Sequence, residues 1–237
     1  MSESELPFYY ALCSNLIDTQ PQMYYNKRGI IWRKANKGGE TMAKIKVVTI
    51  GRRFCTGGSD IGKMVAERLG VKCYDREIVE MAAEKVGVPM SEVVKNEESM
   101  MNWLKTPISL FGQPELTLAE KIFAAEAEII LDICSKQSCV IVGRCADYIL
   151  KNRVKTLSVF ITASLEKRIQ TAETKHGIED HPEDRLKKYD QKRSRFYNSN
   201  TNKEWGSIDS YDMCLDSGKL GYEMCADIIA KTVEMSE

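Results

Sequence analysis

The chain has 237 residues, and 43% of them are hydrophobic, which is enough for one domain with a sizeable core. Its 34 Lys and Arg residues balance its 34 Asp and Glu residues. That balance argues against a dedicated nucleic-acid-binding protein, although a local basic site could still bind phosphate. No apolar run approaches the ~20 residues that a membrane span requires, so we expect no membrane partner.

The eight cysteines include no C-x-x-C pair, and only His176 and His181 could complete a zinc site. We therefore expect no structural metal site, and the ligands of any other metal stay unassigned. Cysteines inside apolar runs such as SCVIVG (138–143) are typical of small buried side chains in a reducing compartment. The N-terminus also lacks the basic and apolar regions of a signal peptide. These features predict a cytoplasmic protein.

Residues 1–41 show no sustained hydrophobic period and end in a cluster of Lys, Asn and Gly. We expect them to be an N-terminal extension that is poorly ordered or packed on a neighbour, or an upstream stretch included by the choice of start codon. Residues 42–237 are predicted to form an α/β domain, in which short apolar runs alternate with amphipathic segments. Strands are expected at 45–50, 71–74, 138–143, 156–161 and 211–215, and helices at 61–69, 78–86, 117–136, 164–175, about 180–200 and 220–235.

Strands that alternate with helices predict a doubly wound α/β fold, in which helices cover both faces of a parallel sheet. Two connections are longer than compact folds usually carry without a use. Residues 87–116 contain three prolines and a Met, Trp and Phe cluster, and they could cover a substrate. Residues 170–207 are very rich in charge, and they could close over phosphates as a lid.

The stretch GRRFCTGGSDIGK (51–63) lies between a predicted strand and a predicted helix. Backbone N–H groups and the positive end of a helix dipole attract an anion at such a turn, and glycine lets phosphate approach the backbone closely. A structural turn is the alternative, because Gly-Gly is common in turns. The candidate phosphate-binding residues are Thr56, Gly57, Gly58 and Ser59.

This loop lacks the Lys of the pattern G-x-x-x-x-G-K-[ST], because Gly57 is followed by Gly58 and Ser59. Arg52 and Arg53 lie just upstream and could supply the missing charge, since Arg makes bidentate bonds to phosphate oxygens. The sequence does not choose between these two arginines.

Further polar residues follow the neighbouring strands, at the edge where open α/β sheets bind ligands. The stretch VGRCAD (142–147) places Arg144 and Asp147 there, and YDREI (74–78) places Asp75 there. Arg144 could instead pair with a carboxylate at the rim of the sheet, and Asp75 could be a helix N-cap. Both interpretations stay open.

The charged segment KKYDQKRSRFYNSNTNKEW (187–205) places Asp190, Arg193 and Tyr197 on one helical face, whereas Arg195 projects elsewhere. Several cations in one segment suit a polyphosphate, because phosphoryl transfer depends on positioning and on neutralising charge. A solvated helix face is the alternative.

Four stretches together resemble the cytidylate kinase-like family, a divergent branch of the P-loop nucleoside monophosphate kinases. The resemblance covers about residues 44–233 and does not reach residues 1–41, and VGRCADYIL and the R-x-x-Y…W-G…Y-D pattern are its most specific parts. The four stretches are VVTIGRRFCTGGSDIGKMVAERLGVKCYDREIVEMAAEKVG, VIVGRCADYIL, SVFITASLEKRI and YDQKRSRFYNSNTNKEWGSIDSYDMCLDS.

The resemblance implies a three-layer P-loop kinase fold, with a five-stranded parallel sheet in the order 2-3-1-4-5, an acceptor-binding insert and a lid. It also implies transfer of the γ-phosphate of ATP to a nucleoside monophosphate, CMP or dCMP by default, with Mg²⁺ as the counter-ion. By the same resemblance, Thr56 to Ser59 would hold the donor phosphates, and Asp75 and Arg144 would face the acceptor. Arg168 lies where kinases of this kind begin their lid, and Arg193 and Arg195 would bring positive charge over the transferring phosphate. With Arg52 and Arg53, these three arginines are the candidate catalytic residues, and Asp147 joins Asp75 and Arg144 as a candidate for binding the acceptor.

The chain departs from cytidylate kinases proper at two positions, since those enzymes carry Lys where this chain has Gly58 and Asp where it has Val142. Two other functions therefore stay open: a nucleotide-binding or regulatory module with little turnover, and a kinase with a non-nucleotide acceptor. The apolar part of the 87–116 insert also fits a contact between copies in a homo-oligomer.

Overall fold

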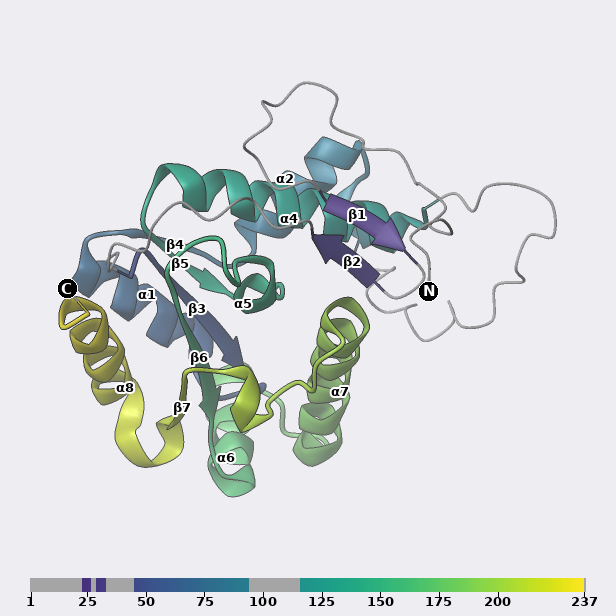
Figure 1. Cartoon of the computed structure of the whole chain (residues 1–237). Coiled ribbons are helices and arrows are strands. Elements are labelled where there is room, and N and C mark those ends of the chain that lie inside the picture. Colours follow the sequence, from purple (N-terminus) through teal and green to yellow (C-terminus); the bar gives the residue numbers. More distant parts are fainter. Residues whose placement is uncertain (1–22, 27–28, 33–44, 94–115, 237) are drawn as a thin grey trace, which may run out of the picture.

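A computed structural model describes residues 23–26, 29–32, 45–93 and 116–236 (Figure 1). At its centre, five parallel strands form one sheet in the order β4-β5-β3-β6-β7. This is the order 2-3-1-4-5 along the chain, so the predicted α/β fold and strand order are confirmed. The strands are β3 (Val47–Arg52), β4 (Lys72–Tyr74), β5 (Cys139–Val142), β6 (Thr156–Thr162) and β7 (Met213–Asp216).

Helices cover both faces of the sheet, which gives the predicted three layers (Figure 1). Helices α1 and α8 pack on one face, and α2, α4 and α5 pack on the other. Helices α6 and α7 contact each other, and α7 reaches the loop that follows β3. The helices are α1 (Gly58–Leu69), α2 (Glu77–Val86), α4 (Leu118–Lys136), α5 (Ala146–Ile149), α6 (Leu165–His176), α7 (Pro182–Thr201) and α8 (Ser217–Glu234).

The central strand β3 is buried on both of its faces. Val48 and Ile50 pack in the cluster with α1 and α8, whereas Val47 packs in the cluster with α2 and α4. Their exposed fractions are 1%, 0% and 0%. A strand between two helical layers is buried on both faces, so it requires a continuous run of apolar residues. The run ends where the strand leads into the polar loop.

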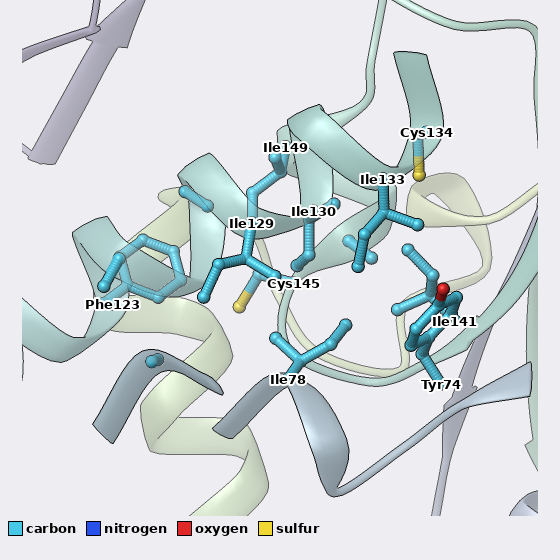
Figure 2. Packing of buried hydrophobic residues seen from close by; sticks show 14 of the residues in the cluster. Tyr74, Ile78, Phe123, Ile129, Ile130, Ile133, Cys134, Ile141, Cys145 and Ile149 are labelled. Carbon is cyan, nitrogen blue, oxygen red and sulfur yellow. The ribbon is translucent and has the colours of Figure 1, made fainter. Parts of the chain in front are cut away.

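The cluster under α2 and α4 is rich in isoleucine. Figure 2 shows Ile130 and Ile133 of α4 facing Ile141 of β5 and Ile78 of α2. Burial of one such side chain stabilises the fold by roughly 1.5–3 kcal/mol. This packing holds β4 and β5 in place, and the polar residues that follow those strands are thereby fixed at the edge of the sheet.

The strand and helix predictions agree with the structure to within a few residues, but four short elements were not predicted. Helix α5 and a 3-10 turn at Ile208–Ser210 each span four residues or fewer. In residues 1–41, where no regular structure was predicted, β1 (Met23–Asn26) and β2 (Gly29–Trp32) pair as an antiparallel hairpin. Elements this short contain too few residues to show a hydrophobic period.

The two long connections have different outcomes. The insert predicted at 87–116 lies mostly outside the described residues, which stop at Val93 and resume at residue 116. The charged connection at 170–207 consists largely of the end of α6 and the whole of α7, so the segment predicted to be a lid is a pair of helices.

Among the described residues, no helix is long and apolar enough to cross a membrane.

Candidate active site at the carboxyl ends of the strands

The loop after β3 leads into α1 through a glycine whose backbone has the left-handed conformation. Gly57 has φ 72° and precedes the helix, and no side chain caps the first turn. The backbone N–H groups of that turn carry the positive end of the helix dipole. Gly58 is buried and Ser59 is half-buried beside them. The turn therefore has the groups that bind an anion at a helix N-terminus.

A carboxylate and an arginine hold this loop from the side of α6 and α7. Asp190 accepts a hydrogen bond from the Phe54 N–H at 2.8 Å, and Arg168 Nε donates to the Phe54 carbonyl at 2.8 Å. Arg168 Nη2 and Asp190 Oδ2 are paired at 2.6 Å, and Arg168 is only 4% exposed. Tyr189 also stacks on the Phe54 ring at 4.2 Å. Arg168 thus fixes the loop backbone instead of extending into open space.

Arg52 crosses the ends of the neighbouring strands. Its Nη2 lies 3.1 Å from Asp75 Oδ1, and its side chain is 17% exposed. Burial and the charge of Arg144 lower its pKa, although the attraction of Asp75 opposes them. The ion pair between Arg52 and Asp75 therefore links the carboxyl ends of β3 and β4.

Arg193 reaches the same place from α7. Its Nη1 donates to the Arg52 carbonyl at 3.1 Å, and its guanidinium lies 5.5 Å from the centre of the Phe54 ring. Burial, followed by repulsion from Arg52, lowers the pKa of Arg193 to about 9. It forms no ion pair with a carboxylate in the part of the chain that the structure describes. A buried cation in this state favours the arrival of an anion.

The turn after β5 has an unusual backbone. Gly143, Arg144 and Cys145 have φ values of 81°, 56° and 56°, which places three consecutive residues in the left-handed region. Each non-glycine residue in this region costs roughly 1–2 kcal/mol, and such strain clusters at functional sites. Arg144 pairs with the fully buried Glu126 and lies over the Phe196 ring at 4.6 Å. The constrained backbone and the ion pair with Glu126 together hold Arg144 at the rim of the sheet. Pairing with a carboxylate at the rim is one of the two interpretations that the sequence left open for Arg144.

Asp147 belongs to a separate polar network behind the turn. Tyr197 of α7 donates a hydrogen bond to Asp147 Oδ2 at 2.6 Å. Burial raises the pKa of Asp147, and the Tyr197 bond counteracts that rise. Burial and the neighbouring Asp147 raise the pKa of Tyr197 in turn. Asp147 therefore anchors the end of α7 to α5.

A polar hollow lies on the other side of the loop, between the first turns of α6 and α8. Lys167, Gln170, Asp216 and Lys219 contribute to its lining. Ser217 at the start of α8 donates a hydrogen bond to the Thr56 carbonyl at 2.8 Å, so the hollow adjoins the phosphate loop.

The structure brings some of the predicted site residues together and leaves others apart. Arg52, Asp75, Arg144 and Arg193 converge at one edge of the sheet. The side chains of Arg53 and Arg195 are exposed, and the hydroxyl of Thr56 donates to the Arg53 carbonyl at 2.9 Å. Sequence reasoning missed the bond between Asp190 and Phe54, which lie 136 residues apart, and it missed the pairing of Glu126 with Arg144.

Tyr222 is a further residue that the sequence did not single out. A Cβ added at Gly57 would lie 2.1 Å from Tyr222 Cζ, so the ring covers this glycine. Lys175 of α6 places its Nζ 4.4 Å from the centre of the Tyr222 ring. The non-helical Gly221, with φ 78° and ψ 165°, directs the tyrosine there. No group of three or more metal-ligating side chains was found among the described residues.

A family model described as the cytidylate kinase-like family matches residues 47–219. The chain belongs to this family. The matched region contains all five strands of the sheet, the loop between β3 and α1, and helices α6 and α7. No curated protein matches the sequence.

Solved structures agree with this membership of the cytidylate kinase-like family at the level of the fold. An uncharacterized protein from Eubacterium ventriosum is 26% identical, with a TM-score of 0.63 over 81% of this chain and 99% of that chain. A shikimate kinase from Bacteroides thetaiotaomicron is 13% identical, with a TM-score of 0.50 over 81% and 99% of the two chains. The family and the fold together identify a kinase-like phosphotransferase with a P-loop architecture.

Replacing Asp190 by Asn tests the loop support. Asn has one acceptor oxygen where Asp has two, so its amide nitrogen would face either the Phe54 N–H or the Arg168 guanidinium, and the buried cation would lose its carboxylate. We therefore expect a loss of about 3–5 kcal/mol in urea unfolding. Asp227→Asn is the control, because Asp227 pairs with Arg68 at 2.7 Å on the surface between α1 and α8. The control should lose much less stability, and equal losses would show that Asp190 does not support the loop.

Replacing Tyr197 by Phe tests the buried carboxylate. In the folded protein, the pKa of Asp147 is raised above its ordinary value of 3.8. Its contribution to the free energy of unfolding is therefore fully present below pH 3.8 and is lost as the pH rises through the folded pKa. Tyr197→Phe removes the bond that limits this loss, so it should cost about 1–3 kcal/mol near pH 8 and less near pH 5. Thermal unfolding at both pH values measures this, with the exposed Tyr189→Phe as a control. A cost independent of pH would contradict the argument.

Proposed function

We propose that this chain transfers the γ-phosphoryl group of ATP to a nucleoside monophosphate, with CMP or dCMP as the default acceptor. The observation that carries the proposal is the convergence of Arg52, Arg144 and Arg193 beside the uncapped first turn of α1. In a member of the cytidylate kinase-like family, such a cluster suits a reaction that brings two phosphate-bearing substrates together.

The donor would lie on the side of α6 and α8. Its phosphates would bind the backbone N–H groups of Gly57, Gly58 and Ser59, and its nucleoside would occupy the hollow that contains Lys167 and Lys219. Mg²⁺ would be held by the donor phosphates with the Ser59 hydroxyl, since this ion is commonly bound through substrate phosphates and few protein ligands. It would supply neutralising charge there.

The acceptor would lie on the side of β4 and β5, beside Asp75 and Arg144, with Asp147 behind the turn. An acceptor phosphate oxygen would attack the γ-phosphorus, the bond to the β,γ-bridging oxygen would break, and ADP would leave with that electron pair. Arg52 and Arg193 would neutralise charge on the transferring group. Arg168 would act through the loop backbone, whereas the exposed Arg53 and Arg195 would have to move to contribute.

Two other functions remain candidates, each for a specific reason. Arginines bind a carboxylate as well as a phosphate, so the cluster also suits a kinase with an anionic acceptor that is not a nucleotide. Glycine at position 58 leaves no lysine in the loop, so a nucleotide-binding module with little turnover is the second.

A transfer screen with the full chain separates these functions. ATP and GTP are each combined with the common nucleoside monophosphates, shikimate and gluconate, at high protein concentration and with several divalent metals. Transfer to CMP or dCMP above all other acceptors supports the proposal. Transfer to shikimate or gluconate alone, or nucleotide-dependent thermal stabilisation without any transfer, would replace it with one of the two alternatives.

Replacing Arg193 by Met tests the cation cluster. The variant removes a buried charge that has no carboxylate partner in the described part of the chain, so its melting temperature without ligand should equal or exceed that of the wild type. Stabilisation by ATP should fall sharply, because the anion loses one of its cations. Lys188→Met, an exposed change on the same helix, should leave both measurements unchanged. A destabilised Arg193→Met variant that keeps its full response to ATP would contradict the assignment.

A further inference from the structure

The glycine at position 58 is required by the path of Arg52. A Cβ added at Gly58 would lie 2.6 Å from Arg52 Cβ and 2.7 Å from Arg52 Cγ. Real Cβ atoms essentially never approach other heavy atoms closer than 3.0 Å. The contacted atoms belong to the stem of Arg52, next to the backbone, so they cannot swing aside as the tip of a side chain could. Any side chain at position 58, lysine included, therefore competes with Arg52 for the same space.

The guanidinium end of Arg52 depends on a second glycine. A Cβ added at Gly143 would lie 2.1 Å from Arg52 Nη1. Gly143 also has φ 81°, which side chains other than glycine rarely adopt. Beyond this glycine, Arg52 Nη2 pairs with Asp75 at 3.1 Å. Arg52 starts on β3, passes the turn after β5 and ends beside the residue that follows β4, so it crosses three neighbouring strand ends in the order of the sheet.

Arg52 also has hydrogen-bonding capacity left for a ligand. Its Nε is buried and, within the described residues, has no acceptor. Such a buried N–H is costly unless something supplies an oxygen. Of the nearby arginines, Arg168 is bound to Phe54 and Asp190, and Arg53 points its side chain into solvent.

We propose that Arg52 is the cation of this phosphate loop, placed in the space that a loop lysine would occupy, and that Gly58 and Gly143 are the clearance that allows it. This inference rests on the proposed function, and it decides between Arg52 and Arg53 as the substitute for lysine. Asp75 is then a positioning residue, because it holds the far end of the guanidinium. The planar fork of Arg can bind two phosphate oxygens, whereas lysine offers a point charge.

An exchange of the two positions tests the proposal in the full chain. The variants are Arg52→Gly, Gly58→Lys and the double variant, and calorimetry measures ATP binding by each without need of an acceptor. Glycine is chosen at position 52 because the Cβ of this residue itself lies 2.6 Å from a Cβ at position 58. Arg52→Gly should lose the cation, and Gly58→Lys should displace Arg52, so each should weaken binding about tenfold or more. The double variant removes the steric conflict and restores a loop cation. Its binding should return to within about threefold of the wild type, which is a non-additive result.

Two further variants keep the test decisive if Gly58→Lys does not fold. Gly143→Ala moves only the guanidinium end and should also weaken ATP binding, and Arg52→Lys should bind less well than the wild type because it lacks the fork. Lys63→Ala changes an exposed cation on α1 and should bind ATP as the wild type does. Circular dichroism and melting temperature establish that each compared variant is folded.

The outcomes separate this inference from the proposed function. Unchanged ATP binding by Arg52→Gly overturns the inference, as does a double variant that is as weak as the product of the two single effects. A wild type that binds ATP but transfers phosphate to no acceptor would end the proposed function, while the binding series would still decide the role of Arg52. A wild type that binds neither ATP nor GTP would overturn both.

Discussion

One carboxylate connects the segments on which the candidate site depends. Asp190 of α7 binds the Phe54 N–H and the Arg168 guanidinium, and Arg168 in turn binds the Phe54 carbonyl. Both backbone groups of a loop residue are thus fixed by side chains from two helices far along the chain. The two helices that were predicted to be a lid therefore also support the loop after β3, and a shift of either helix would change the position of that loop.

The rest of the site follows from an excess of buried positive charge. Arg144 has Glu126, Arg168 has Asp190 and Arg52 has Asp75, whereas Arg193 has no paired carboxylate among the described residues, and its pKa is lowered to about 9. Folding around such a cluster costs free energy that a neutral core would not. An anionic ligand would offset that cost, so a local excess of positive charge favours an anion even in a chain of zero formal net charge.

The sequence was sufficient for the fold because its signals there are local. The runs VVTI and CVIV are buried on both faces, as parallel strands between helical layers must be, and the chain order of strands and helices then restricts the topology. The position of Asp75 and Arg144 at the sheet edge was predictable for the same reason. The choice between Arg52 and Arg53 could not be predicted from the sequence, because it depends on which of the two side chains fits beside the turn after β5. Likewise, Tyr222 reaches Gly57 only through the break at Gly221.

The close approach of Arg52 to Gly58 also constrains how such a loop can arise from one that carries lysine. In this backbone, any residue at position 52 other than glycine brings a Cβ to within 2.6 Å of a Cβ at position 58. A lysine at position 58 therefore requires glycine at position 52 or a shifted backbone. Gain or loss of a side chain at position 58 is thus coupled to a second change in the same loop.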